Sequence, residues 1–300
     1  MIVKIIVVVF VIILIEGACE LIYKHTPSYK KSQEQNRRIK NVPNNLDVVN
    51  IGSGPAYYGF DYDFCDKRGY NLATAPQNFT YGYKLLKHYS KKINKDAIIL
   101  ITIMAPMSFG ENRDVYRNDY ADKFYGVLKP EEIDNYSVFR RIVIALPFLS
   151  RICKRIKNVF SDRTNVEIKS VVDIWKQEFE LNDLQDASQA DMHSKTFADK
   201  VCLVKEMIEY CYSQSWHPVL VIPPVPAVTR KHISEQFTDV FVYNNITKIL
   251  RDYSNLICLD YYSDDLFDSG CFKSSIFLNN KGKELFSKKV FADIGINKGE

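Results

Sequence analysis

The 300-residue chain is 46% hydrophobic and 25% charged, which suits a protein with a large buried core and excludes an intrinsically disordered one. The formal net charge is only +4, because 40 basic residues are interspersed with 36 acidic ones, so the charge gives no indication of nucleic-acid binding. Seven cysteines form no CxxC pair and no metal-ligand spacing, and their redox state stays open. Since no GxGxxG or P-loop motif is present either, the sequence predicts neither a metal site nor a cofactor.

The chain begins with an apolar run, Ile2 to Ile15, that is broken only by Lys4. Extended to Tyr23, this run reaches about the 20 residues that a bilayer requires. We therefore expect residues 1–23 to form an uncleaved signal anchor or transmembrane helix. A cleaved signal peptide and a lipoprotein signal at Cys19 are the alternatives. More basic residues follow the run than precede it, which taken alone favours a cytoplasmic body.

Residues 24–45 are polar and basic and contain two prolines, which is typical of a linker. From residue 46 to residue 300, short apolar runs alternate with amphipathic stretches. The runs predicted as strands are Leu46–Ile51, Tyr70–Ala73, Ala97–Met104, His217–Pro224 and Leu256–Tyr261. The stretches predicted as helices are Gln77–Ile93, Val201–Tyr212, Phe241–Tyr253 and Asn280–Ile294. Because continuous apolar runs suit parallel strands covered on both faces, we expect an α/β three-layer sandwich with a mainly parallel, about five-stranded sheet.

The alternation fails between about residues 110 and 195, where we expect a helical insertion. Its most distinctive part is Arg140–Phe160, which is apolar and basic with Pro147 near its middle. This segment is either a helix packed on the domain or an amphipathic element at a membrane surface, where its basic side chains would meet lipid headgroups.

The most informative segment is Asn50–Asn71, NIGSGPAYYGFDYDFCDKRGYN, because it places a tight turn directly after the first strand. In a parallel α/β sheet, sites form at the carboxyl ends of the strands. Ser53 is the only hydroxyl in the turn Gly52-Ser53-Gly54. It is either a nucleophile, which would need a base and an oxyanion hole, or a turn serine that bonds to the local backbone.

The blocks VVNIGS, YYGFDY, GYNLA and FLNNKGKELFSK are similar to those of the SGNH/GDSL-like hydrolase and acyltransferase superfamily, and in particular to its membrane-anchored bacterial proteins of cell-surface polysaccharide and teichoic-acid acylation. That family carries a nucleophilic serine in the first block and an Asp and a His near the C-terminus. The resemblance places these three positions on Gly54, Ile276 and Phe277. It therefore implies an SGNH/flavodoxin-like fold with a degenerate triad, because these side chains offer neither a nucleophile nor a base.

The same resemblance implies which residues line the site. The backbone of Gly52 and Gly54 and the side-chain amides of Asn71 and Gln77 are the candidate substrate-binding or oxyanion groups, although Asn71 could instead cap a loop. Ser53 is the candidate catalytic residue if the protein is active as a serine esterase or O-acyltransferase.

None of the five histidines lies where the family has its base. His193 and His232 lie in polar, loop-like surroundings, from which either could approach the strand ends, but we expect both to face solvent.

The resemblance implies a membrane-anchored, single-pass protein with an extracytoplasmic domain that acts in cell-surface glycan acylation or deacylation. The replaced triad positions favour an alternative, a non-catalytic glycan-binding or scaffold subunit that partners a multi-pass membrane acyltransferase. A third hypothesis is a sugar-nucleotide-binding transferase, for which Asp61-Tyr62-Asp63 supplies the formal DxD triplet.

Overall fold

The computed structural model describes residues 2–110, 121–148, 171–181 and 183–298. Contacts divide the chain into two compact units, and each is described by itself. Unit 1 comprises Met1–Asn41 and Ala121–Ile168, and unit 2 comprises Val42–Tyr120 and Lys169–Glu300.

Unit 2 is built on a parallel sheet. Its strands are β1 (Leu46–Ile51), β2 (Gly69–Asn71), β3 (Ile93–Thr102), β4 (His217–Ile222) and β5 (Ile257–Asp260), in the spatial order β2-β1-β3-β4-β5. This is the strand order of doubly wound, flavodoxin-like sheets. The predicted α/β class and the five parallel strands are confirmed over the described residues.

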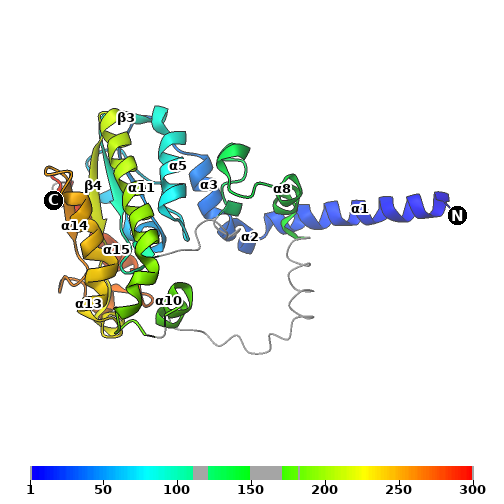
Figure 1. The fold of residues 1–300 in the computed structure, drawn as a ribbon. Coiled ribbons are helices and arrows are strands. Elements are labelled where there is room, and N and C mark those ends of the chain that lie inside the picture. Colours follow the sequence, from blue (N-terminus) through cyan, green and yellow to red (C-terminus); the bar gives the residue numbers. More distant parts are fainter. Residues whose placement is uncertain (1, 111–120, 149–170, 182, 299–300) are drawn as a thin grey trace. The chain divides into compact units, whose positions relative to one another are not determined.

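Helices cover both faces of the sheet. On one side α5 (Phe79–His88), α11 (Ser194–Ser213) and α14 (Asn244–Leu250) lie along it, as Figure 1 shows. The other face buries Val48, Leu100 and Val219 against Phe286 and Phe291 of α15 (Asn280–Asp293). Because side chains alternate along a strand, the continuous apolar runs supply both of these layers.

Short helices make the connections of unit 2. They are α4 (Gly54–Gly59), η1 (Tyr62–Phe64), η2 (Ser90–Lys92), α6 (Met107–Gly110), α10 (Val171–Phe179), η4 (Ser188–His193), α12 (Ala227–Arg230), α13 (Glu235–Thr238), the π-helical turn η5 (Asp239–Tyr243) and η6 (Ser269–Cys271). The predicted helix Gln77–Ile93 is shorter than expected, because Asn78 caps its start, α5 ends at His88, and η2 separates it from β3.

Unit 1 contains α1 (Ile2–His25), α2 (Pro27–Ser32), α3 (Glu34–Lys40), η3 (Pro130–Glu132) and α8 (Val138–Ala145). Segment 24–45, expected as a linker, therefore holds two helices, and Ile39 of α3 is fully buried. Pro27 begins α2, where the missing N–H costs no helical hydrogen bond, so this proline marks a helix start rather than a break.

The expected anchor, residues 1–23, falls in α1 apart from Met1, which lies outside the described residues. Among the helices that the structure describes, none combines the length and the apolar character needed to cross a membrane.

The expected insertion, at about residues 110–195, adds no strand to the sheet in its described parts. Of the segment Arg140–Phe160, the structure describes residues 140–148, where α8 ends at Ala145; the rest lies outside the described residues.

Candidate functional site

The predicted turn lies at the point where the strand order of the sheet reverses. Strand β1 is flanked by β2 on one side and β3 on the other, and in such sheets the crevice at the carboxyl ends of these strands is the usual ligand site. Gly52 has φ of 141°, and a Cβ there would lie 2.8 Å from Cβ of Thr102 and 2.9 Å from Cβ of Ala56. Glycine is therefore required at this position, both by its backbone and by the close approach of β3.

The side chain of Gln77 holds this turn from the inside. Its Oε1 accepts a hydrogen bond from the N–H of Gly52 (2.7 Å), and its Nε2 donates to the carbonyl of Leu72 (3.1 Å). Gln77 is only 4% exposed, so these bonds are shielded from water. The N–H of Gly52, a candidate oxyanion donor, is thus already engaged by the protein.

Ser53 lies half-buried at the start of α4. Its Oγ accepts a hydrogen bond from the backbone N–H of Gln77 (3.3 Å), and within the described part of the chain this is its side-chain partner. A serine nucleophile needs a base within hydrogen-bond reach, and no described histidine bonds to Ser53. His217 begins β4, so it lies at the opposite, amino-terminal edge of the sheet.

The expectation that His193 faces solvent is wrong. This histidine is 5% exposed, and its ring packs 6.0 Å from that of Phe197 and 5.4 Å from that of Phe241. It lies just before α11, and its ring packs in an apolar layer between α11 and η5. The sequence does not reveal this layer, because its aromatic side chains come from segments far apart in the chain. His232 is exposed, as expected.

Gly54 and Phe277, the positions aligned with the nucleophile and the base, are in contact. A Cβ on Gly54 would lie 2.8 Å from Cζ of Phe277, closer than real Cβ atoms approach other carbons. The Phe277 ring packs on Tyr58 at 5.0 Å, and the ammonium of Lys273 lies 3.2 Å from the Tyr58 ring centroid. The aromatic ring therefore occupies the space that a side chain at position 54 would need.

Ile276, aligned with the triad aspartate, also lies close to the turn. It is 9% exposed and lines a void of about 10 Å³ together with Pro55, Met104 and Pro223. An alkyl group in this apolar setting can neither orient a base nor accept a proton.

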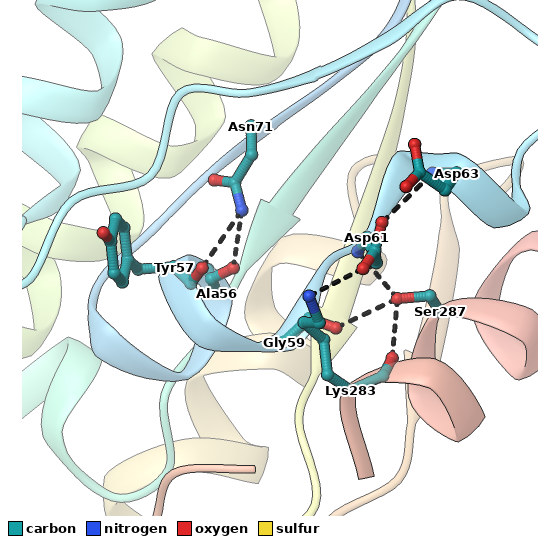
Figure 2. Close-up of polar contacts among 8 residues, drawn as sticks. All are labelled: Ala56, Tyr57, Gly59, Asp61, Asp63, Asn71, Lys283 and Ser287. Atoms are coloured by element: carbon teal, nitrogen blue, oxygen red, sulfur yellow. Dashed lines mark hydrogen bonds and ion pairs between the residues drawn. The ribbon is translucent and has the colours of Figure 1, made fainter. Parts of the chain in front are cut away.

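Asn71 is buried, and its side chain is fully used by the protein. Its Nδ2 donates to the carbonyls of Ala56 (3.2 Å) and Tyr57 (3.3 Å), as Figure 2 shows. Its Oδ1 accepts from Asn50 Nδ2 (3.1 Å) and from the N–H of Ala73 (3.0 Å). Because a side-chain amide offers two donor hydrogens and two acceptor lone pairs, these four bonds exhaust it.

The triplet Asp61-Tyr62-Asp63 fastens α15 to the segment after α4. The Asp61 carboxylate pairs with Lys283 Nζ (2.6 Å) and accepts from the N–H of Asp63 (3.2 Å), while the N–H of Asp61 donates to Ser287 Oγ (2.8 Å), as Figure 2 shows. Burial opposes ionisation of Asp61, but the bonds from Lys283 and Asp63 outweigh it and hold the pKa of Asp61 below its usual value.

The described residues contain no cluster of three or more His, Cys, Asp or Glu side chains suited to a metal ion. A carboxylate paired with lysine is a poor metal ligand, so the geometry of Asp61 does not favour the transferase hypothesis.

The cavity beside Ser53 is small. It has a volume of about 20 Å³ and is lined by Gly52, Ser53, Gln77 and Thr102, among others. This volume holds about one water molecule and excludes an acyl group.

A much larger cavity, of about 490 Å³, lies elsewhere in unit 2 and is lined by residues of α12, α13 and η5 and by Tyr262 and Ser263. No sequence motif predicts this cavity, because its lining comes from two segments that meet only in the fold.

No protein-family model and no curated protein matches the chain. Among solved structures, one from Bacteroides fragilis, described as that of a "putative acylhydrolase", is similar with a TM-score of 0.42 and 11% sequence identity, covering 88% of this chain and 95% of that one. A likeness at this level carries no argument about the activity or the residues of this chain.

Proposed function

We propose that this chain is an SGNH-like protein of cell-surface glycan acylation or deacylation that has lost the acyl-serine chemistry and instead binds glycan or positions a partner enzyme. The observation that carries the proposal is the contact of Phe277 with Gly54. A nucleophile at position 54 would need the space that the ring fills. The assignment to glycan acylation rests on the family resemblance of the sequence blocks.

The nucleophile and the base of the covalent route are replaced, and one of the two candidate oxyanion donors, the Gly52 N–H, is engaged by Gln77. Acyl transfer through serine needs a nucleophile, a group that takes its proton, and donors for the developing oxyanion. At these three places the chain has Gly54, Phe277 and a Gly52 N–H that is bonded to Gln77. Ser53 lies one residue away, but the N–H of Gln77, which donates to its Oγ, cannot act as a base.

The proposal includes a membrane anchor in residues 1–23, an extracytoplasmic body, and a multi-pass membrane acyltransferase as partner. These features come from the sequence and the family resemblance. Unit 1 offers supporting chemistry, because α8 exposes Val138, Phe139 and Ile142 at 65%, 75% and 52% of their surface. Exposed apolar side chains on a helix that also carries Arg141 suit a membrane surface or a membrane protein, whereas the neighbouring Arg140 is paired with Asp122.

The loss of chemistry is tested with a fluorophosphonate probe and an acetyl ester substrate. We expect no labelling of the wild-type protein and no ester hydrolysis above that of Ser53→Ala. Ser108→Ala is the matched control, since Ser108 lines the same small cavity and accepts a hydrogen bond from Met104 N. Hydrolysis by the wild type and the Ser108 variant that Ser53→Ala abolishes would show that Ser53 is a nucleophile and contradict the proposal.

The anchor and the partner are tested by fractionation and co-purification. We expect the full-length protein in the membrane fraction, carrying a multi-pass protein with it in mild detergent, and a chain that starts at Val42 in the soluble fraction. Full-length protein that is soluble without detergent would contradict the anchor. Membrane-bound protein that purifies alone would contradict the scaffold role.

A further inference from the structure

A cavity of about 490 Å³ lies beyond the carboxyl ends of β4 and β5. The segments that follow the two strands run side by side, since the N–H of Tyr261 donates to the carbonyl of Ile222 (3.0 Å) and the N–H of Val225 to that of Tyr262 (3.2 Å). The volume falls within the range of small-molecule sites, about 300–1,000 Å³. It thus has room for a ligand that the cavity beside Ser53 lacks.

One wall combines an aromatic ring with a fixed guanidinium. Arg230 Nε donates to the carbonyl of Val225 (3.0 Å), and its Cζ lies 6.0 Å from the ring centroid of Tyr262. Among the described residues, the two terminal nitrogens of Arg230 make no hydrogen bond to protein. They are therefore held as donors at a cavity that Arg230 and Tyr262 both line.

Asp260 positions the two tyrosines that line the cavity. Its Oδ1 accepts from the N–H of Tyr262 (2.9 Å), and its negative charge also acts on the nearby Tyr243 hydroxyl. Burial and then the nearby Asp260 raise the pKa of Tyr243 far above its usual value, so the phenol stays neutral. Both rings are thus part of a pre-formed wall.

The π-helical turn η5 brings Asp239 and Tyr243 to the same cavity. Asn245 Nδ2 donates to the carbonyls of Val240 (3.2 Å) and Phe241 (3.3 Å) and so engages carbonyls of the turn. Insertions of this kind are rare and occur frequently at functional sites. The turn is thus a second, independent feature that points to a ligand here.

The charges around the cavity determine the class of ligand. Arg230 and Lys231 supply two positive charges, Glu235 and Asp239 supply two negative ones, and Asp260 adds a third negative charge behind the tyrosines. This set of charges gives no net attraction for a phosphate or a carboxylate, but it does offer several hydrogen-bond donors and acceptors. With aromatic walls beside them, these groups match an uncharged ring that carries several hydroxyls.

We propose that this cavity binds a single uncharged sugar ring of a glycan, with the ring against Tyr262 and hydroxyls bonded to Asp239, Glu235 and Arg230. The inference assigns a place to the glycan-binding role. It rests on the proposed function only for the statement that the sugar belongs to a cell-surface glycan. It assigns the glycan to a site beyond β4 and β5, away from the Ser53 turn.

The test is titration of the full-length protein in detergent with glucose, N-acetylglucosamine and the acyclic polyol ribitol, followed by ligand-observed NMR. We expect saturable binding of at least one of the two ring sugars and weaker binding of ribitol, which has no ring face. Asp239→Asn and Arg230→Gln should each weaken that binding about tenfold, because each removes a charge-assisted hydrogen bond. The matched controls Asp265→Asn and Arg251→Gln change exposed residues outside the cavity lining and should leave binding unchanged.

Thermal unfolding of each variant establishes that it is folded. Absence of binding by both sugars, equal binding of ribitol, or binding that neither cavity variant weakens would overturn the inference. The serine-probe assay separates the two proposals. A protein that reacts with the probe yet binds sugar here refutes the proposed function alone, whereas one that is inert to the probe and binds no sugar refutes this inference alone.

Discussion

The Phe277 ring lies where a side chain on residue 54 would begin, so each of these two residues limits what the other can be. We predict that Gly54→Ser destabilises the protein by about 1 kcal/mol, the low end of the cost of overpacking, because the outer edge of the half-exposed Phe277 ring must shift, and that it yields no esterase activity. Chemical denaturation and an acetyl ester assay measure the two effects.

A double-mutant cycle isolates the cause. In a Phe277→Ala background the space is open, so Gly54→Ser should cost less than in the wild type. An equal cost in both backgrounds would show that the ring is not the obstacle. The triple variant Gly54→Ser, Ile276→Asp, Phe277→His restores all three reactive groups. It is the one combination in this series from which some hydrolysis is expected.

For single residues, the sequence predicted the reactivity of side chains better than it predicted their orientation. Glycine, isoleucine and phenylalanine lack reactive groups in any fold, so their inertness could be read directly from Gly54, Ile276 and Phe277. The directions of the Gln77 and Asn71 amides could not, because they depend on which backbone groups a loop leaves unpaired. In the fold, the unpaired groups are the N–H of Gly52 and the carbonyls of Ala56 and Tyr57. The amide of Gln77 bonds to the first, and the amide of Asn71 bonds to the other two.

At the scale of elements, α15 is fastened to the segment after α4 by a buried hydroxyl. Ser287 is fully buried, and its Oγ accepts from the N–H of Asp61 and lies 3.1 Å from the carbonyl oxygen of Gly59. We predict that Ser287→Ala lowers the free energy of unfolding by about 0.5–1.5 kcal/mol at any pH, because it leaves the half-buried Asp61 N–H without its acceptor. Urea denaturation at pH 7 and at pH 2.5, on either side of the range in which Asp61 begins to be protonated, checks this. A loss that depends on pH would assign the effect to the neighbouring ion pair instead.

The Asp61–Lys283 pair of the same junction should show a pH dependence. The pKa of Asp61 is lowered in the folded state, so its contribution is present above the unfolded pKa of about 3.9 and is lost as the pH falls through the lower, folded value. We predict that Lys283→Met costs about 0.5–1 kcal/mol at pH 7, since the pair is partly exposed, and progressively less as the pH falls below the unfolded pKa of Asp61.

Lys288→Met is the control on the same helix. Lys288 pairs with Glu284 in an i,i+4 arrangement whose side chains are 55% and 49% exposed, so its loss should be close to neutral at every pH. Denaturation curves between pH 2.5 and pH 7 compare the two variants. Parallel behaviour of both would contradict a specific role of Lys283.

The sequence predicted the bounds of an element closely where they coincide with an apolar or amphipathic pattern, and poorly where the element ends in polar residues. Strand β1 and helix α15 match their predicted ranges to within one residue, because an apolar run or an amphipathic period defines them. Strand β3 begins four residues before the predicted Ala97, in the polar stretch from Ile93 to Asp96. The start of β3 is determined by backbone pairing with β1, which the polarity of the side chains does not reveal.

At the scale of the whole molecule, the predicted insertion is divided between two units. Residues 121–148 belong with the N-terminal helices, where Lys24 Nζ donates to the carbonyl of Ala145 (3.1 Å) and the N–H of Phe148 donates to Glu20 Oε1 (2.8 Å). The partners are more than 120 residues apart in the chain, so no local pattern could reveal them.

This division predicts separate stabilities for the two units. The core of unit 2, including Val48, Leu100, Val219 and Phe286, is supplied by unit 2 itself, whereas the partners of Ala145 and Phe148 lie in α1. A chain that starts at Val42 should therefore keep the hydrogen-exchange protection of β1, β3 and β4 and lose that of α8. Phe148→Ala in the full-length chain is the milder test, because it removes the ring that packs 6.0 Å from Tyr23 and should lower protection in unit 1 alone. Exchange measured by mass spectrometry resolves the two regions. Loss of protection in the sheet on removal of residues 1–41 would show that unit 2 needs unit 1 to fold.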